Sequence, residues 1–494
     1  MKESIARINS QKISEVVSNL CKQANICISK DVYNALFDSY LKEKSPKAKY
    51  SLWQILENLK LATTIERPIC QDTGIVVVFL EIGQNILIEG DSIEDAINLG
   101  VQQAYEENFF RKSIVNDPVF ERINTNTNTP AIIYPTFTTG NSIKITVSIK
   151  GCGCENMSAV QMLKPSAGPE GIVEFAVETL KSAGANTCPP VRLGIGIGGT
   201  MEYAAVLAKK ALLEAVKTES DLERLIDSEP DSNNKKMLQM ELDILQGINN
   251  LKIGANGLGG DITAFGINIK SYPTHIAALP VAININCHAS RHARAEISDN
   301  DVKYYPENYE SNFKNIENLE NSSAKIDVDD IEALRKLQAG DMVFLNGYIY
   351  TARDAAHKKL FECINNNKEL PIDIKDKIIY YTGPCPPVKG EIIGPAGPTT
   401  SIRMDKYTPV LMEKGLFGSI GKGARSEEVI ESIKKNKGIY LATTGGAATL
   451  LGQKIIESEI VAYPELGTEA IYRFKVQDFP AIVAIDSNGN SILK

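Results

Sequence analysis

The sequence predicts an α/β protein of two domains, and three observations support this. The chain has 494 residues, too many for one ordinary hydrophobic core. Runs rich in β-branched residues alternate with runs of helical period. A polar, asparagine-rich stretch at 296–328 divides this alternation in two. We therefore predict an N-terminal domain at 1–295, a polar linker at 296–328 and a smaller C-terminal domain at 329–494.

The first domain opens with helical patterns that continue to about Leu61. The β-branched run GIVVVFLEIG at 74–83 predicts a strand. A serine followed by acidic residues then begins a predicted helix at 92–113. The remaining elements predicted here are a strand at 142–151, a helix at 171–184, a strand, glycine turn and helix at 191–212, and a strand at 275–287.

The second domain is predicted to begin with a helix, a strand and a helix at 331–362. Four strand-like segments follow, at 376–383, 437–445, 454–466 and 469–486. No internal repeat was found. The two regions together predict two α/β units.

Composition narrows the class of protein. The formal net charge of −8 argues against nucleic acid as a partner. No run approaches the ~18–20 apolar residues of a membrane span, and the N-terminus lacks a secretory pattern. Nine cysteines, an odd number in a chain without export signals, favour reduced thiols over a disulfide framework. We therefore expect a cytoplasmic protein that binds neither membrane nor nucleic acid.

Three cysteines share one kind of setting, at a strand edge beside proline or glycine. They are Cys70 in PICQDTG, Cys188 in NTCPPVRLG and Cys287 in ININCHAS. Taken singly, each is best interpreted as a small buried hydrophobe. Three thiolates that converge from strand ends can instead hold an iron–sulfur cluster. One iron without a protein ligand could then bind substrate oxygen as a Lewis acid.

Other cysteines leave this assignment open. Cys21, Cys27 and Cys363 lie in helical patterns. Cys152 and Cys154, in KGCGCENMS, compete for the ligand role because a C-x-C pair could supply two thiolates. Position in the sequence does not exclude them.

Glycine-rich segments offer weaker signals. GIGIGGT at 194–200 follows a strand, but its spacing does not match a dinucleotide-binding loop, so we favour a tight turn near a ligand. GPAGPTTSIRMD at 394–405 could present hydroxyls and Arg403 to a small carboxylate, although a structural turn is the simpler interpretation. His275 precedes the predicted strand that ends at Cys287, and this position makes it a candidate site residue, although a lone histidine is more often structural.

Six segments together resemble one family, the class I, iron–sulfur fumarate hydratases and their relatives the L-tartrate dehydratases. The likeness covers most of the chain in the family's order, and this chain resembles the form in which α and β subunits are fused. The segments are RPICQDTG, GIGIGGT, HIAALPVAININCHASRHARA, AGDMVFLNGYIYTARDAAHKKL, GPAGPTTSIRMD and EAIYRFKVQDFPA.

The resemblance implies a hydro-lyase that interconverts fumarate and malate. It implies a [4Fe–4S] cluster held by Cys70, Cys188 and Cys287, with a free iron that binds the carboxylate and hydroxyl of a small dicarboxylate. It places the active site between the two domains and implies a homodimer. An exposed iron of this kind also implies inactivation by air.

The resemblance further implies roles for individual residues. Asp72 is the expected acid at the substrate hydroxyl. The expected base is a C-terminal threonine, Thr449, with Thr399 and Thr400 left open. The remaining expected substrate contacts are Gln71, Arg111, Gly153, His275, Arg403 and Arg473.

The sequence also departs from the family's pattern. Cys152 and Cys154 stand where Gly and Ser are usual, Tyr472 and Arg473 where Trp and Lys are common, and Asn256 where Gln or Met is frequent. L-tartrate or a methylated dicarboxylate therefore stays open as substrate. A non-catalytic iron–sulfur protein would not need Asp72 or Arg403. A nucleotide-binding enzyme is disfavoured by the loop spacing.

Overall fold

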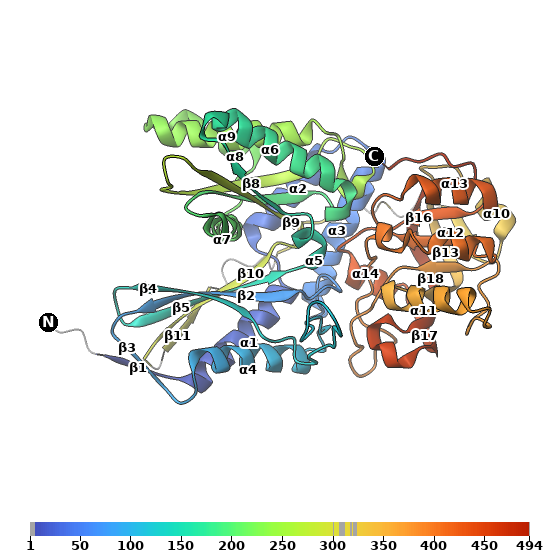
Figure 1. Ribbon diagram of the computed structural model, residues 1–494, viewed down its shortest axis with the longest axis horizontal. Helices are drawn as coiled ribbons and strands as arrows, with labels where there is room; N and C mark the ends of the chain where they lie inside the picture. The colour runs from blue at the N-terminus through green and yellow to red at the C-terminus, as the bar shows by residue number, and fades with distance from the viewer. Residues whose placement is uncertain (1–4, 300, 306–311, 317–318, 320–323, 494) are drawn as a thin grey trace.

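The computed structural model describes residues 5–299, 301–305, 312–316, 319 and 324–493. It confirms an α/β architecture, with an N-terminal part and a C-terminal part side by side (Figure 1). The N-terminal part contains two separate layers of sheet and helix. No helix among the described residues is both long and apolar enough to cross a membrane.

The first layer of the N-terminal part is a five-stranded sheet covered by two helices. Its strands, in spatial order, are β11 (Asp301–Tyr304), β10 (Arg291–Ser298), β5 (Ser142–Lys150), β2 (Ile75–Gly83) and β4 (Ile132–Thr138). The helices α1 (Ser10–Ile26) and α4 (Ile93–Glu107) pack on one face, where side chains alternate along β5 between core and surface.

The second layer is a four-stranded sheet with helices on both faces. Its strands, in spatial order, are β6 (Ala159–Leu163), β9 (Leu279–Cys287), β7 (Val191–Gly198) and β8 (Ala264–Tyr272). Its helices are α6 (Gly168–Ala183), α7 (Met201–Ala211), α8 (Glu219–Ser228) and α9 (Ser232–Asn249). A Cβ on Gly196 would lie 1.9 Å from the Ala204 carbonyl oxygen of α7. The glycines of GIGIGGT therefore serve close strand–helix packing.

Short elements complete the N-terminal part. The strands β1 (Ala6–Asn9) and β3 (Ile86–Glu89) form a two-stranded sheet. The helix α2 (Lys30–Lys42) is followed by α3 (Pro46–Thr64), which reaches the C-terminal part (Figure 1). The four-residue helix α5 (Cys152–Glu155) follows β5 directly.

The C-terminal part is built around a seven-stranded sheet. Its strands, in spatial order, are β12 (Ala324–Asp327), β13 (Met342–Thr351), β14 (Ile378–Tyr380), β15 (Gly418–Gly421), β16 (Ile439–Ala442), β18 (Ile471–Ile485) and β17 (Ile455–Ala462). Its helices are α10 (Ile331–Lys336), α11 (Asp354–Asn365), α12 (Thr408–Glu413), α13 (Glu427–Asn436) and α14 (Ala448–Gln453). The long strand β18 also pairs with β13, so five strands close into a ring.

The structure differs from the sequence prediction for one helix, and it places strands in the predicted linker. The helix predicted at 92–113 is wrong beyond Glu107, because Phe109 has a left-handed φ of 53° and the chain turns away. The stretch 296–328, predicted as a linker, contains β11 at one end and β12 at the other, and each joins a different sheet. Its residues 300, 306–311, 317–318 and 320–323 lie outside the described residues.

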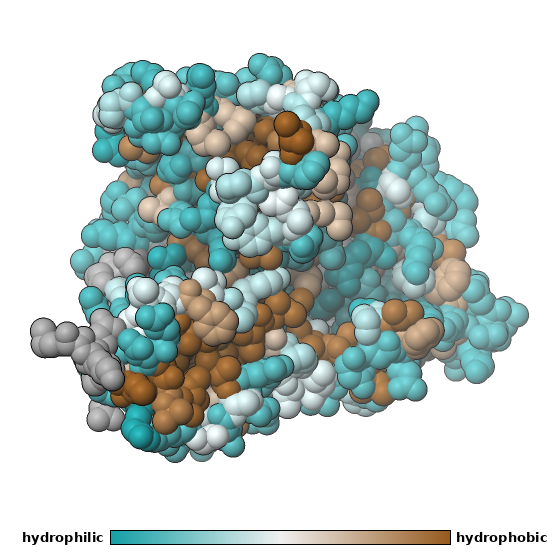
Figure 2. Space-filling model, turned by 60° about the vertical axis from the view of Figure 1, so that its left-hand side comes forward, coloured by the Kyte–Doolittle hydropathy of each residue, from teal (hydrophilic) through white to brown (hydrophobic). Residues whose placement is uncertain are grey.

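Apolar side chains also reach the surface of the N-terminal part. Figure 2 shows a group of them on the lower half of one face. Exposed apolar residues of the edge strand β4 include Ile132 and Phe137. Scattered apolar exposure is normal, whereas a contiguous group can mark a contact surface.

Candidate active site

Strand pairing explains how Cys188 and Cys287 meet. Val191 at the start of β7 is the pairing partner of Cys287 at the end of β9. Cys188 lies three residues before Val191, in a left-handed conformation with φ 55°. The two sulfurs interact electrostatically. The sequence argument from strand ends therefore brings this pair together.

A second pair of strands brings in Cys70. Ile75 at the start of β2 pairs with Lys150 at the end of β5. The turn between Cys70 and β2 is tight, because a Cβ on Gly74 would lie 2.6 Å from the Lys150 carbonyl oxygen. The Cys70 sulfur interacts electrostatically with Cys287, and burial raises its pKa to about 12. All three cysteines singled out in the sequence thus lie in one cluster.

A fourth thiol, Cys154 of α5, belongs to the same cluster. It is buried, and its sulfur lies 3.2 Å from the Thr187 carbonyl oxygen. Its interaction with Cys287 is the first cause that lowers the pKa of Cys287 below the usual range. Cys152 differs, because its side chain is exposed.

Asp72 lies between this thiol cluster and a group of cations. Its carboxylate accepts hydrogen bonds from Arg111 Nη2 at 3.1 Å and from the Cys152 backbone N–H at 3.0 Å. Arg291 donates to its backbone carbonyl at 2.8 Å. Burial acts to raise the pKa of Asp72, but Arg111, Arg291 and the Cys152 N–H outweigh burial and hold the pKa below its usual value. The side chain is therefore a fixed carboxylate.

Arg111 and Arg353, one from each part of the chain, lie near Asp72. Arg111 also donates to the Gly383 carbonyl oxygen at 3.0 Å, which joins it to the C-terminal part. Arg353 is mostly buried, pairs with Glu469 at 3.4 Å, and interacts electrostatically with Arg111 and Arg403. Burial is the first cause that lowers the pKa of Arg353. Such a group of guanidinium ions suits a ligand with two carboxylates.

Arg403 lies at the exposed side of this group. It is partly exposed and forms a two-pronged ion pair with Asp354, with Nε 3.0 Å from Oδ1. Its guanidinium is therefore already oriented by a partner before any ligand binds.

Gln71 connects the Cys70 loop to the glycine- and proline-rich loop of the C-terminal part. Its side-chain amide donates to the Pro398 carbonyl oxygen at 3.2 Å. A Cβ on Gly397 would lie 2.3 Å from Gln71 Oε1, so a side chain at this position would displace the Gln71 amide. Thr399 follows directly and is buried, and among the described residues its hydroxyl has no hydrogen-bond partner. That hydroxyl is free to act on a ligand.

Lys422 supplies a cation at the thiol cluster. It follows β15 directly and donates from Nζ to the Cys188 sulfur. A Cβ on Gly153 would lie 3.6 Å from the same Nζ. Burial acts to lower the pKa of Lys422, but the thiols, with Cys188 first, raise it above its usual value. The structure therefore places Gly153, a predicted substrate contact, beside this ammonium group.

The structure does not bring His275 to the cluster. His275 lies in the exposed loop between β8 and β9, where its Nδ1 accepts a hydrogen bond from the Ala277 N–H at 3.1 Å. Cys287 ends β9 at the other end of the strand, about 25 Å away by the rise of a β-strand. Within this chain the two residues occupy opposite ends of one strand.

Arg473 and Thr449 are also placed apart from the cations. Arg473 lies on the surface of β18 and pairs with Glu459 at 2.7 Å. The Thr449 hydroxyl is buried and donates to the Pro68 carbonyl oxygen at 2.7 Å. That hydrogen bond fixes Pro68, two residues before Cys70, so the Thr449 hydroxyl has a structural role.

Sequence reasoning missed three residues of the site: Lys422, Arg353 and Arg291. Lys422 and Arg353 each follow the end of a strand almost directly, which is the signal that identified the three cysteines. Arg291 lies in the segment CHASRHA, four residues after Cys287. Treating cationic residues at strand ends as candidates, as was done for the cysteines, would have identified these three residues.

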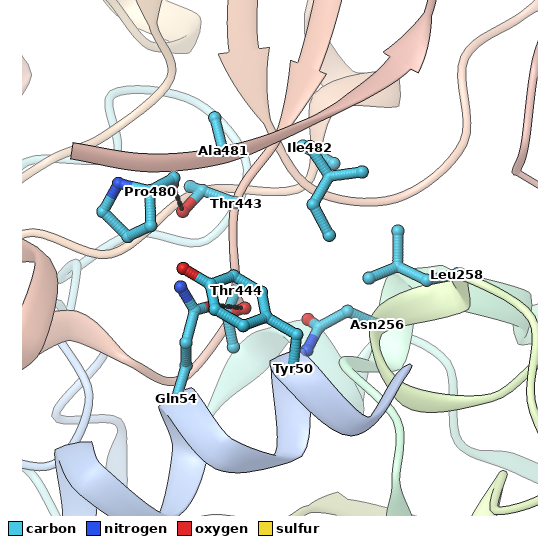
Figure 3. Close-up of a pocket in the computed structure, with 10 residues that line it drawn as sticks. Tyr50, Gln54, Asn256, Leu258, Thr443, Thr444, Pro480, Ala481 and Ile482 are labelled. Atoms are coloured by element: carbon cyan, nitrogen blue, oxygen red, sulfur yellow. Dashed lines mark hydrogen bonds between the residues drawn. The ribbon is translucent and has the colours of Figure 1, made fainter. Parts of the chain in front are cut away.

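A polar seam between the two parts lies beside the thiol cluster (Figure 3). Asn256 donates to the Ser51 hydroxyl at 2.7 Å and accepts from the Gly445 N–H at 2.9 Å. Thr444 in turn hydrogen-bonds Gln54 of α3. A Cβ on Gly445 would lie 2.6 Å from the Cys188 sulfur, so the seam positions a glycine against a thiol. The residues that line the hollow at this seam are Tyr50, Gln54, Asn256, Leu258, Ala442, Thr443, Thr444, Pro480, Ala481 and Ile482.

Comparison with known proteins gives consistent matches over the chain. The family model for fumarate hydratase (Fumerase) matches residues 14–296, and the model for the fumarase C-terminus matches residues 292–494. The chain is 33% identical to "Fumarate hydratase class I, aerobic" of Escherichia coli (strain K12), over 92% of this chain and 84% of that protein. It is 29% identical to "Putative fumarate hydratase class I" of Geobacillus stearothermophilus, over 98% and 96%.

A third relative matches one half of the chain. The chain is 45% identical to "Putative L(+)-tartrate dehydratase subunit alpha" of Methanocaldococcus jannaschii. This match covers 57% of the present chain and 96% of that subunit.

Proposed function

Because this chain belongs to the fumarate hydratase (Fumerase) family, whose members are hydro-lyases, we propose that it catalyses the reversible hydration of fumarate to malate. The observation that carries the proposal is the position of Asp72. Its carboxylate is held ionised between a thiol cluster and arginines from both parts of the chain. A proton acceptor lies there beside groups that bind carboxylates.

The residues present fit an iron–sulfur cluster. Cys70, Cys188 and Cys287 come from separate strand ends, and Cys70 and Cys188 each interact with Cys287, which suits thiolates that bind different irons of one cluster. No three His, Cys, Asp or Glu groups in the described ranges are arranged to hold a single metal ion. A bound [4Fe–4S] cluster would supply a Lewis acid for the substrate's hydroxyl and carboxylate. The glycine at 445 leaves the space beside Cys188 that a bulkier residue would fill.

Asp72 and Thr399 are the residues proposed to move protons. In the direction of hydration, the Asp72 carboxylate takes a proton from the attacking water. In the reverse direction it returns this proton to the leaving hydroxyl. The proton at the neighbouring carbon needs a second group, and Thr399 has a free hydroxyl next to the Gln71 contact. Of the three threonines considered, Thr449 is the least suited because Pro68 occupies its hydroxyl.

The cations are proposed to bind the substrate's two carboxylates. Arg111 and Arg353 are buried or nearly so, and Arg403 closes the exposed side. Negative charge develops on the carboxylate next to the reacting carbon, and preorganised guanidinium groups stabilise it. Gln71, Gly153 and Lys422 would line the same space. Arg473 and His275 could join only with a rearrangement or from a second copy, so a homodimer remains a prediction.

L-tartrate dehydration is the second candidate. The observation in its favour is the 45% identity, over 57% of this chain, to a subunit named as a putative L(+)-tartrate dehydratase subunit alpha. The two reactions share the loss of a hydroxyl next to a carboxylate, so the same Asp72 and arginines serve both. A methylated dicarboxylate belongs to the same group of substrates.

The test is an anaerobic assay of the chain reconstituted with iron and sulfide. Malate, L-tartrate and methylmalate are compared side by side at equal concentrations. We expect turnover of malate to exceed that of the others, and Asp72→Asn to lower kcat by about 100-fold or more. The matched control is Asp341→Asn, a surface aspartate away from the cluster. Full activity of Asp72→Asn, or turnover of tartrate alone, would overturn the assignment to fumarate.

A further inference from the structure

Three of the groups that the proposed function takes from the C-terminal part lie on two neighbouring segments. Thr399 and Arg403 belong to the loop at 399–405, whereas Lys422 follows β15 directly. The Ser401 N–H of that loop donates to the Lys422 carbonyl oxygen at 2.9 Å. The backbone therefore joins the proposed proton-transferring hydroxyl and the two cations through one short pairing.

A buried arginine, Arg425, ties the 399–405 loop to the strand and helix beside it. Its side chain is fully buried. Its Nε donates to Asp405 Oδ1 at 2.7 Å, Nη1 to the Ser419 hydroxyl at 3.0 Å, and Nη2 to the Thr408 hydroxyl at 2.7 Å. Asp405 ends the loop, Ser419 lies on β15 and Thr408 begins α12. One guanidinium group thus holds three elements in three directions.

The Asp405 carboxylate completes this junction. Its second oxygen accepts from the Ser426 N–H at 2.5 Å, so it binds both the Arg425 side chain and the backbone that follows it. Arg403 lies two residues before Asp405, and Lys422 lies four residues before Ser426. The ion pair is therefore within a few residues of both proposed substrate-binding cations.

Two tyrosines lie against the same guanidinium. Its carbon atom lies 4.9 Å from the ring centre of Tyr440 and 5.4 Å from that of Tyr381. The Tyr440 hydroxyl bridges the Ser401 hydroxyl at 2.8 Å and the Gly423 carbonyl oxygen at 3.0 Å. The Tyr381 carbonyl oxygen accepts from the Thr399 N–H at 2.6 Å. Each ring that packs on the guanidinium thus also anchors the loop.

We propose that Arg425 is a positioning residue for the reaction, which fixes the 399–405 loop against Lys422 so that the Thr399 hydroxyl and the two cations keep one arrangement. This inference rests on the proposed function, because it takes Thr399, Arg403 and Lys422 as groups that act on the substrate. A fully buried side chain acts on a ligand only through the groups that it holds. Buried ion pairs often add little net stability, whereas a misplacement of ~1 Å at a reacting group can cost about 100-fold in rate.

The planar fork of arginine suits this position in a way that lysine does not. An ammonium group is a compact point charge, so it does not present flat faces to two rings while reaching three acceptors. We expect Arg425→Lys to lower kcat by about 10-fold or more per intact cluster. KM should change less than about threefold, because Arg111 and Arg353 bind carboxylates from other segments.

A second background separates positioning from stability. Thr399→Val already lacks the hydroxyl that Arg425 is proposed to position. Adding Arg425→Lys to it should therefore lower kcat much less, by about threefold at most. A purely structural role would lower kcat by the same factor in both backgrounds, and that result would overturn the inference.

Hydrogen exchange measured by mass spectrometry gives a readout without turnover. In the full chain, Arg425→Lys is expected to speed exchange in peptides that cover 399–405 and 421–426 and to leave peptides of α3 unchanged. Unchanged exchange in the first two peptides would contradict the inference. Absence of malate turnover by the wild type would instead contradict the proposed function, so the two failures are distinguishable.

Two further variants complete the experiment. Arg335→Lys is the matched control, since Arg335 also pairs with a carboxylate, Glu332 at 2.7 Å, and lies over the Phe417 ring, but on the surface. It should change neither kcat nor the exchange of these peptides. Tyr440→Phe keeps the ring and loses only the bridging hydroxyl, so it decides the question if Arg425→Lys does not fold. It should show the same pattern as Arg425→Lys, and wild-type kcat and exchange in Tyr440→Phe would overturn the inference.

Discussion

The Lys422 ammonium donates a hydrogen bond to the Cys188 sulfur, and this contact joins the two parts of the chain at the thiol cluster. Lys422 follows β15 in the C-terminal part, whereas Cys188 precedes β7 in the N-terminal part. Neither part alone therefore has both the thiols and the cation. A positive charge at this point offsets the negative charge of thiolates or of an incoming dicarboxylate.

Removing the charge of Lys422 is expected to impair catalysis. Lys422→Met keeps most of the side-chain length but loses the ammonium group. We expect kcat/KM for malate to fall about 100-fold, because a preorganised cation at the reacting carboxylate is lost. Anaerobic steady-state kinetics measure this. Lys435→Met, which removes a surface lysine paired with Glu413, is the matched control and should leave kcat/KM unchanged.

The three proposed ligands are expected to be individually necessary for the cluster. Cys70→Ser, Cys188→Ser and Cys287→Ser should each lose the visible absorbance of the anaerobically reconstituted protein. Cys154→Ser should keep it, because three thiolates remain. Cys363→Ser on α11 is the control for a thiol outside the cluster. Full iron content in Cys188→Ser would exclude Cys188 from the ligand set.

The two threonines are expected to separate catalysis from stability. Thr399→Val should lower kcat by about 100-fold or more, since a general acid–base group contributes about that much. Thr399→Ser should recover much of the rate. Thr449→Val should instead lower the free energy of unfolding by about 1–3 kcal/mol, because the buried Pro68 carbonyl loses its donor. If Thr449→Val lost the activity and Thr399→Val did not, the assignment would be reversed.

His357 is expected to make stability depend on pH. It is fully buried on α11, its Nδ1–H donates to the Arg353 carbonyl oxygen at 2.9 Å, and burial lowers its pKa to about 4. An unfolded histidine has a pKa of about 6.5, so the unfolded chain binds this proton first as the pH falls. The contribution is complete above pH 6.5 and is lost progressively toward pH 4.

The size of this effect follows from the shift. Between pH 7 and pH 5 the loss due to His357 should be about 2 kcal/mol of unfolding free energy. Urea unfolding of the wild type and of His357→Gln at both pH values measures it. The variant should be less stable at pH 7 but should lose about 2 kcal/mol less on acidification. His275→Gln, in an exposed loop, should show the wild-type pH dependence.

The sequence predicted the thiol cluster because strand ends are visible in it. Cys188 and Cys287 stand at the ends of clear β-branched runs, and strand pairing then brings the ends together. The α/β class followed from the same periodicity. The sequence could not show that Cys154 packs beside Thr187 and the thiol cluster, because α5 is only four residues long and carries no periodic signal.

Other differences have equally specific causes. The helix predicted through Ser113 ends at Glu107, because Phe109 adopts a left-handed backbone conformation. Phenylalanine rarely adopts this conformation, so the sequence gives no sign of it. Thr449 was favoured by motif position, but the bond from its hydroxyl to Pro68 depends on how the two parts meet. His275 was chosen for its place on the strand of Cys287. A strand has two ends, and periodicity alone does not say which one the site uses.

The seam at Asn256 has a consequence for how the molecule holds together. Asn58 donates to the Gly446 carbonyl oxygen at 3.0 Å and accepts from the Leu450 N–H at 3.0 Å, so side chains of α3 bind backbone of the other half. These contacts and the Asn256 hydrogen bonds are noncovalent, so they can hold the two halves together without a peptide link between them. A chain severed between its two largest sheets should therefore stay together as a nicked heterodimer, in keeping with the relative named as a separate subunit alpha, which matches 57% of this chain.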